Sequence, residues 1–349
     1  MVEQQSVYEL SLNLVIEWQA HSLSTIGSNG TNRVLPRRQL LSDQVEVDAC
    51  SGNILKHQHA ALVAPHFLAQ QCPLCPACLK LDGRRAAALL DHPAYQPMTM
   101  SHLLNACALC DAHGFLVTAK NAEMPKGREK KLQAEKTDSP LEQKTGEPGE
   151  EKEPQEKENE ARSKLHKESL LNFSYGLAFP DRQAETSQLH TRVGQNREEG
   201  QMLMKMSVRS GAYAVLIRYT CVGIGADTQK WELVVPDQSQ RMKRHIAILT
   251  ALRDQLVSPS GAQTTTILPH LTGLRGAIVL RTGVGRAPCC SPLDPLFQTR
   301  LTHMADPTCQ VHLFEGVDTF YQLMQQMIAT TMPAHHPAWI PPTPPQQDQ

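Results

Sequence analysis

The first pattern in the chain is an alternation of apolar and polar side chains near its start. Between residues 8 and 18 the period is two, which is typical of a strand with one buried face. One face would carry Tyr8, Leu10, Leu12, Leu14, Ile16 and Trp18, and the other Glu9, Ser11, Asn13 and Glu17. We therefore expect a half-buried strand, followed by a polar, arginine-containing loop from His21 to Arg38.

The apolar spacing changes to that of a helix after Ser51. Ser51-Gly52-Asn53 is a helix-start signal, because an N-cap serine accepts a hydrogen bond from the first turn. The expected apolar face includes Ile54, Leu55, Leu62 and Phe67. Pro65 should kink or end this helix, since proline lacks the N–H that a helix interior uses.

Strands and helices return in the second half of the chain. Residues 202–219 alternate as one long strand or two, and residues 231–235 and 277–280 predict two more strands. Helical spacing of apolar residues predicts a helix around 242–256 and another at 317–328. This order predicts an α+β, ferredoxin-like βαββαβ unit, the fold of RNA-recognition motifs, although an unrelated α+β domain fits the pattern equally well.

Residues 120–168 differ from the rest in composition. They contain no Val, Ile, Phe, Tyr or Trp, and Glu, Lys, Gln, Pro and Gly dominate. Such a segment cannot bury enough apolar surface to offset the entropy of ordering it, so we expect a disordered insertion. It holds 12 of the 34 Lys and Arg and 13 of the 35 Asp and Glu, which leaves 22 of each sign elsewhere. Any contact with nucleic acid must therefore come from a local cationic patch.

Targeting signals are not evident. No apolar run reaches the ~18 residues that a membrane span needs. The first residues lack the basic start and apolar stretch of a signal peptide. We expect a soluble, cytoplasmic protein with no membrane partner.

The densest chemical signal is a cluster of cysteines. Of the ten in the chain, five fall within 39 residues, as Cys-Pro-Leu-Cys-Pro-Ala-Cys at 72–78 and Cys-Ala-Leu-Cys at 107–110. Two Cys-x-x-Cys knuckles can each supply two thiolates to one tetrahedral zinc ion. We expect the ligands Cys75, Cys78, Cys107 and Cys110 of a structural zinc, with Cys72 or His113 able to replace one of them. A thiol redox centre and a set of unligated buried cysteines are the alternatives.

Two short segments could meet phosphate. The capped helix start at Ser51 would present free N–H groups beside Lys56, with Arg33, Arg37 and Arg38 upstream. The loop Arg281-Thr282-Gly283-Val284-Gly285-Arg286 follows a strand and carries two arginines, but it lacks the Gly-Lys-Ser/Thr of a P-loop. An ordinary helix cap and a plain turn are the structural alternatives. No hydrolytic motif accompanies them, so we expect no enzyme activity.

Several segments together resemble the DevR family of CRISPR-associated autoregulators. They are Glu17-Trp18-Gln19-Ala20-His21-Ser22-Leu23, Ser51-Gly52-Asn53-Ile54-Leu55-Lys56-His57, Cys107-Ala108-Leu109-Cys110-Asp111-Ala112-His113-Gly114-Phe115-Leu116, Arg209-Ser210-Gly211-Ala212-Tyr213, Gly285-Arg286-Ala287-Pro288 and Ser291-Pro292-Leu293-Asp294-Pro295. The resemblance runs from about residue 6 to 330, without 120–168. The element around Cys110 is the most specific of the set.

The resemblance implies a backbone subunit of a type I (Cascade) CRISPR interference complex. Such a subunit has an RNA-recognition-motif palm, stacks head to tail with copies of itself, and displaces guide bases with a β-hairpin thumb, here at about 181–204. The implied partners are CRISPR RNA, target DNA through the guide, the guide-end cap and large subunits, and the guide-processing ribonuclease. The RNA contacts expected are His21, Arg33, Arg37, Arg38, Asn53, Lys56, His57, Arg192, Met202, Arg281 and Arg286.

These expectations divide the chain into five parts. Residues 1–69 begin the palm, 70–119 form the zinc-knuckle insertion, 120–168 the charged insertion, 169–332 the rest of the palm with the thumb, and 333–349 a Pro-rich tail. Two rival functions remain. One is a zinc-containing transcriptional regulator, which should show a helix-turn-helix. The other is a type III-like backbone ribonuclease, which would use an aspartate near the first helix, such as Asp43 or Asp48.

Overall fold

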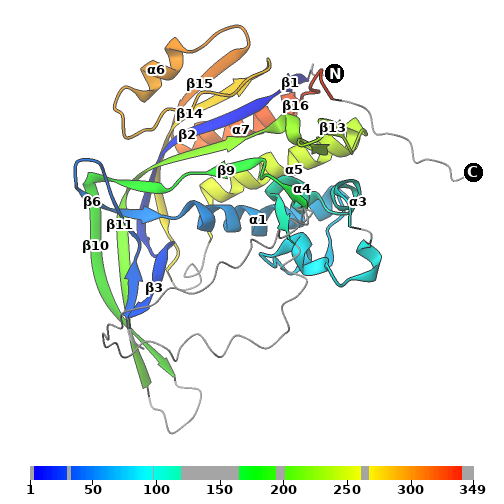
Figure 1. Cartoon of the computed structure of the whole chain (residues 1–349). Coiled ribbons are helices and arrows are strands. Elements are labelled where there is room, and N and C mark those ends of the chain that lie inside the picture. Colours follow the sequence, from blue (N-terminus) through cyan, green and yellow to red (C-terminus); the bar gives the residue numbers. More distant parts are fainter. Residues whose placement is uncertain are drawn as a thin grey trace, which may run out of the picture.

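The computed structural model describes residues 4–29, 33–96, 98–118, 165–193, 201–260 and 267–339. The chain is a mixed α/β protein built around a ten-stranded sheet (Figure 1). Among the helices of the described residues, none combines the length and the apolar character that a membrane crossing requires.

The main sheet is ordered by pairing between strands far apart in sequence. Its path is β15-β14-β2-β11-β10-β6-β5, and neighbours along it are antiparallel. In that order the strands are Cys309–Glu315, His270–Arg281, Glu9–His21, Gln201–Tyr219, Gly176–Val193, Glu46–Cys50 and Arg38–Leu40. The short strand β9 (Leu171–Phe173) pairs with the end of β11. The first strand of the chain's core therefore lies at the centre of the sheet, between β14 and β11.

Three helices cover one face of this sheet: α1 (Gly52–Ala69), α5 (Gln238–Val257) and α7 (Val317–Thr330). They share one core with the apolar side of β2, in which Leu10, Leu12, Leu14 and Ile16 are fully buried. Ser51 caps α1 as expected, because its side chain accepts a hydrogen bond from Asn53 N. The helix continues through Pro65 to Ala69, so of the two expected effects the end of the helix at Pro65 is wrong. Val63 and Phe67, both fully buried, hold the helix in place on either side of the proline.

The expected polar face of β2 is buried as well, so the prediction of a half-buried strand is wrong. Glu9, Ser11 and Asn13 are at most 3 % exposed. The segment after β14 covers them and bonds to them: Ala287 N and Cys290 N donate to Glu9 and Asn13, and Ser11 Oγ donates to Pro288 O. Helix α6 (Phe297–His303) packs on the same side through Phe297 and Leu301. These polar side chains face a covering loop rather than water.

The segment expected to be an arginine-containing loop is largely strand. Strands β3 (Thr25–Asn29) and β4 (Arg33–Pro36) pair with each other, and β4 also pairs with β11 in parallel. Strands β10 and β11 run past the rest of the sheet (Figure 1). The residues of β4 are extended because they pair with this projecting part of β11. These two long strands form one antiparallel hairpin, with register from Leu177↔Ala214 to Val193↔Gln201. Residues 194–200, which join them, lie outside the described residues.

The remaining elements are short. The knuckle region holds α2 (Pro76–Leu79), the 3-10 turns η1 (Arg85–Leu89) and η2 (Pro93–Tyr95), α3 (Met100–Ala106) and α4 (Ala108–His113). Strand β7 (Phe115–Val117) pairs with β8 (Leu165–Lys167). Strand β12 (Ala226–Asp227) follows the turn η4 (Cys221–Gly223) and pairs with β13 (Glu232–Leu233), and β1 (Gln5–Val7) pairs with β16 (Thr331–Pro333).

Two expected boundaries need correction. The charged insertion cannot extend to 168, because β8 begins at Leu165 and Lys167 is 4 % exposed; residues 120–164 lie outside the described ones. The expected tail does not begin at 333, because Ala334 and Trp339 are buried against Val222, Ala226 and Leu233. In both places a few side chains contact distant parts of the fold, and composition alone does not predict these contacts.

Candidate metal centre and nucleic-acid interface

The two cysteine knuckles have the same local structure. Cys75 is the N-cap of α2 and Cys107 the N-cap of α4, and the second cysteine of each knuckle lies three residues into the helix. Cys107 Sγ accepts a hydrogen bond from Cys110 N at 3.4 Å. Pro76 occupies the first helical position, where its fixed φ favours the helix and no N–H is needed. The proline of this knuckle is therefore explained by helix initiation, without a redox role.

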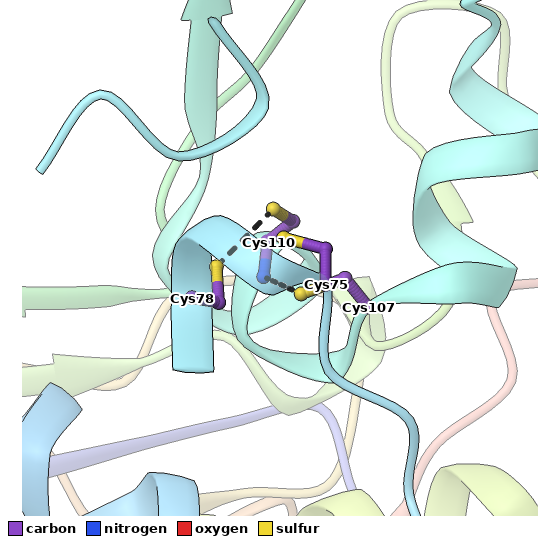
Figure 2. A group of neighbouring side chains, drawn as sticks. All are labelled: Cys75, Cys78, Cys107 and Cys110. Atoms are coloured by element: carbon purple, nitrogen blue, oxygen red, sulfur yellow. Dashed lines mark hydrogen bonds between the residues drawn. The ribbon is translucent and has the colours of Figure 1, made fainter. Parts of the chain in front are cut away.

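The four side chains meet at one point (Figure 2). The sulfur atoms of Cys75, Cys78, Cys107 and Cys110 all lie within 4.8 Å of one another, and all four residues are buried. A tetrahedral metal with S–metal bonds of about 2.3 Å needs S···S separations of about 3.8 Å. The Cys78–Cys110 separation is 3.6 Å. The donor set and its spacing fit a bound metal ion.

The protons of these four thiols are not equivalent. Hydrogen bonding from Cys107 lowers the pKa of Cys75, whereas hydrogen bonding to Cys107 raises the pKa of Cys78 and of Cys110. A metal ion would bind these thiols in their deprotonated form, so its binding would release their protons.

Neither alternative ligand joins the cluster. Cys72 is buried, and its thiol points to Gln70 O at 3.9 Å. His113 turns to His59, with 2.8 Å between its Nε2 and His59 Nδ1. The ambiguity left by three cysteines in the first knuckle is thus resolved in favour of Cys75 and Cys78.

Asp111, directly after the last cysteine, fastens the knuckles to the body of the protein. Its carboxylate accepts from Arg244 Nη1 at 2.7 Å and from Gly225 N, and lies 3.2 Å from Lys167 Nζ. Arg244 and Lys167 are buried and donate further to the carbonyls of Leu104, Gly223 and Ala226. One carboxylate thus joins α4, α5 and β8.

Gly114 completes this junction. It has φ +70°, and a Cβ there would lie 2.3 Å from Lys167 O. Only glycine permits both the left-handed backbone and this close approach of β8. The specific Cys-Asp-x-His-Gly element is therefore a joint between the knuckles and the sheet-and-helix core.

The expected contacts on α1 lie in a groove. Asn53 and His57 are exposed and Lys56 is half-buried, and all three line a cavity of about 690 Å³ between α1 and the knuckle region. Burial, and then the nearby charge of Arg85, lower the pKa of Lys56 to about 8. The structure places these three residues in one groove.

The same groove contains residues that the sequence analysis missed. Arg84, Arg85 and His166 line it from the opposite side. Arg84 and Arg85 follow the first knuckle as a basic pair, a signal that could have been noticed. His166 fell within the tract assigned to disorder, so its position depended on β8.

The expected contacts near the base of the hairpin are already engaged. His21 is 1 % exposed, and its Nε2 lies 2.7 Å from Tyr213 Oη, so a direct RNA contact by His21 is wrong for this fold. Burial lowers its pKa to about 3. Arg37 donates to Ser24 Oγ and Thr25 O, and Arg38 pairs with Glu185.

Asp48, a candidate for the ribonuclease alternative, belongs to the same buried cluster. It accepts from Arg209 Nη1 at 2.5 Å and from Tyr213 Oη at 2.6 Å. Arg209 is 1 % exposed and also donates to Ser24 O. Asp48 therefore anchors β6 to β11 and, through Arg209, to the segment after β2. Asp43 is exposed in the turn before β6.

The remaining expected contacts are spread over other regions. Arg281 pairs with Asp306 at 2.9 Å, whereas Arg286 is exposed and lines a separate cavity of about 530 Å³ with Arg218 and Trp231. Arg192 and Met202 are register partners next to the hairpin turn, and Arg33 pairs with Lys205 in register. The side chains of Arg33, Arg192 and Met202 lie outside the described ones.

Comparisons with known proteins agree with the motifs. The family model described as "CRISPR-associated negative auto-regulator DevR/Csa2" matches residues 13–292, so this is a CRISPR-associated protein. The chain belongs to the DevR/Csa2 family, which confirms the resemblance found in its sequence. No curated protein matches the chain.

Two solved structures match the chain over most of its length. One, titled "CRISPR RNA-guided surveillance complex, pre-nicking", has a TM-score of 0.45 and 11% identity, over 92% of this chain and 99% of that chain. The other, titled "CRISPR RNA-guided surveillance complex", has a TM-score of 0.40 and 9% identity, over 92% of this chain and 98% of that chain.

Proposed function

We propose that the chain is a backbone subunit of a type I CRISPR interference complex. It binds CRISPR RNA without regard to sequence, does not cleave it, and stacks head to tail on further copies along the guide. Target DNA then pairs with the held guide, and the guide-end cap, large and guide-processing subunits complete the assembly. Membership of a CRISPR-associated family gives the context for this proposal.

The observation that carries the proposal is the β10–β11 hairpin. It extends beyond the main body of the fold (Figure 1), and most residues from 181 to 189 are exposed. Leu189, on this exposed part of the hairpin, is 66 % exposed. A projecting hairpin with an apolar side chain suits a thumb that inserts between guide bases and touches the next copy.

The strand order supports an RNA-recognition-motif palm. The path β14-β2-β11-β9, with α1 and α5 on one face, is the 4-1-3-2 order of a βαββαβ unit. The opposite face of β2 is covered by the segment at 287–290, so the bases cannot stack there as they do on an open motif. RNA contacts would then come from the hairpin and from the edges of the palm.

Zinc is the metal we propose for the four cysteines. Four thiolates form a closed tetrahedral set that leaves no position for a substrate, so the ion would be structural. Bound there, zinc would supply folding energy and no chemical step. The knuckles would be fixed by zinc on one side and by Asp111 on the other.

A non-catalytic role is supported by the fate of Asp48. Its two carboxylate oxygens are occupied by Arg209 and Tyr213, so it is unavailable as a metal ligand or base for RNA cleavage. The alternative of a transcriptional regulator is disfavoured by α4. Helices α3 and α4 are consecutive and short, so α4 would be the recognition helix of a helix-turn-helix. Every residue of α4 is buried, whereas a recognition helix must be exposed to enter a DNA groove.

The test is to purify the full chain with its bound nucleic acid and measure the nucleic acid by mass. We expect RNA of uniform length, bound equally well when its sequence is changed. Incubation with a complementary target RNA and magnesium should leave that RNA intact. Cleavage that Asp43→Asn abolishes would instead establish the ribonuclease alternative, and protein free of RNA would overturn the proposal.

A further inference from the structure

The groove between α1 and the knuckle region is notable for its charge. Of its fourteen lining residues seven are Lys, Arg or His, and among the described residues no Asp or Glu lines it. One wall is the start of α1, with Asn53, Lys56 and His57. The other wall comes from the turn before η1 and from β8, with Arg84, Arg85 and His166. A concave surface with cations on two sides and no carboxylate between them attracts an anion.

Lys56 has no carboxylate partner among the described residues, in contrast to Arg38, Arg209 and Arg244, each of which forms an ion pair. It is half-buried beside Arg85, and both effects lower its pKa to about 8. An anion in the groove would neutralise both cations and restore the favourable charged state of the lysine. The floor offers another polar group: His113 is 2 % exposed, and its Nδ1 has no hydrogen-bond partner among the described residues.

The knuckle wall is fixed in place by the cysteine centre. Arg85 Nη1 donates to the carbonyls of His113 and Gly114, at the end of the second knuckle, at 2.6 and 2.8 Å. Ala108 N, in the second knuckle, donates to Pro73 O beside the first. Arg84 in contrast is exposed, and among the residues that the structure describes its one ion pair is with Asp82. Such a surface ion pair contributes little to stability, so a ligand can replace it. The adjacent Gly83 has open space around it, so a ligand can come close to the backbone there.

We infer that this groove binds backbone phosphates of single-stranded RNA, and that the metal knuckle is thereby one wall of the RNA interface. The inference rests on the proposed guide binding and adds a second wall to it. Phosphate is favoured over bases because the groove offers cations and amide or imidazole donors, while its one aromatic residue outside the histidines, Phe115, is 7 % exposed. Contact should therefore be independent of base sequence.

The test uses Arg84→Glu in the full chain, with Arg300→Glu as the matched control. Both arginines are exposed and each pairs with one aspartate, but Arg300 lies on α6, away from the groove. Binding of two unrelated single-stranded RNAs is measured over a salt series. We expect Arg84→Glu to weaken both RNAs by about tenfold at low salt and to make the salt dependence shallower by a slope of about 0.7 per lost contact. Arg300→Glu should match the wild type.

The outcomes separate the two proposals. Wild-type protein that binds no RNA would overturn both the proposed function and this inference. Wild-type binding that Arg84→Glu leaves unchanged would overturn the inference alone. If Arg84→Glu and Arg300→Glu weaken RNA binding equally, the loss of affinity comes from the change in net charge. That result would also overturn the proposal that the groove binds RNA. Equal metal content and melting temperature of the two variants exclude a folding defect as the cause.

Discussion

The two cationic regions of the molecule differ in what their charges do. At the base of the hairpin, Arg38 pairs with Glu185, Arg182 with Glu17, and Arg209 with Asp48. In the groove beside α1, Lys56 has no acidic partner among the described residues, and Arg84, which is exposed, has only Asp82. The first set of cations is used to hold strands together, and the second is available for a ligand. Residue type alone does not separate them.

Each region is also organised by one buried carboxylate. Asp48 joins β6, β11 and the segment after β2 at the hairpin base, and Asp111 joins the knuckles to α5 and β8. The difference is that the knuckle side has four cysteines as a second fixing point, while the hairpin depends on strand pairing. The knuckle side should therefore be rigid but dependent on metal, and the hairpin base should be sensitive to pH.

The largest effect is expected from removing a cysteine ligand. Cys107→Ser should abolish stoichiometric zinc binding and destabilise the knuckle wall, because metal binding in such sites supplies about 10 kcal/mol or more. Elemental analysis and yield of soluble protein are the measurements. Cys72→Ser is the control, since Cys72 is buried nearby but outside the cluster. A folded, metal-free wild-type protein would show that the cluster needs no ion.

Breaking either buried carboxylate should come next. Asp111→Asn and Asp48→Asn should each lower the free energy of unfolding by about 3–5 kcal/mol, because buried cations lose their counter-charge. Asp111→Asn should lower the free energy of unfolding more than Asp48→Asn, because both Arg244 and Lys167 then lose their counter-charge. Urea unfolding measures both. Asp294→Asn, in an exposed pair with Arg300, should change little, and an equal loss there would contradict the comparison.

The hairpin base should respond to acid through His21. Its pKa is about 3 in the fold because of burial and the charge of Arg209, against 6.5 in an unfolded chain. Below pH 6.5 the unfolded state binds the extra proton, so stability rises with pH between about 3 and 6.5 and is lost as pH falls through that window. His21→Gln should remove about 1.4 kcal/mol per pH unit from the slope near pH 5. Parallel stability curves for the variant and the wild type would refute this.

A smaller effect is expected for single groove cations. Lys56→Ala should weaken RNA binding several-fold for any sequence and make the salt dependence shallower by about 0.7. Lys56→Glu should be worse. Arg37→Ala should leave the slope unchanged, because Arg37 is bonded to Ser24 and Thr25 and does not line the groove. A change for Arg37→Ala equal to that for Lys56→Ala would remove the distinction between the two regions.

The smallest effect is expected for deletion of residues 120–164. Val117 and Leu165 are register partners in β7 and β8, so a short linker can join the two ends. We expect RNA binding and metal content to stay as in the wild type. Extending the deletion to residue 168 should instead reduce soluble protein, because it removes Lys167 from Asp111. Loss of RNA binding from the shorter deletion would contradict this expectation.

Local features were predictable from the sequence where one short segment contains the whole interaction. The cap at Ser51 and each Cys-x-x-Cys knuckle depend on residues a few positions apart, so spacing is sufficient to find them. The element at Cys110 to Phe115 was recognisable for a similar reason. Its structural role was not predictable, because Asp111 forms ion pairs with Arg244 and Lys167 and Gly114 packs against the backbone of Lys167. Both of these partners are distant in sequence.

Burial and charge pairing, by contrast, were decided only by the tertiary structure. In sequence, Arg37 and Lys56 are two basic residues near one helix start, and Ser11 and Asn13 look like a solvent face. The fold gives Arg37 hydrogen-bond partners, leaves Lys56 without an acidic one, and covers Ser11 and Asn13 with a segment about 277 residues later. A side chain's environment depends on which distant strands and loops reach it, and the periodicity of its own segment contains no information about them. The sequence determined the two cysteine knuckles, the helix start and the family of this protein, and tertiary contacts determined which four cysteines meet and which cations lack an acidic partner.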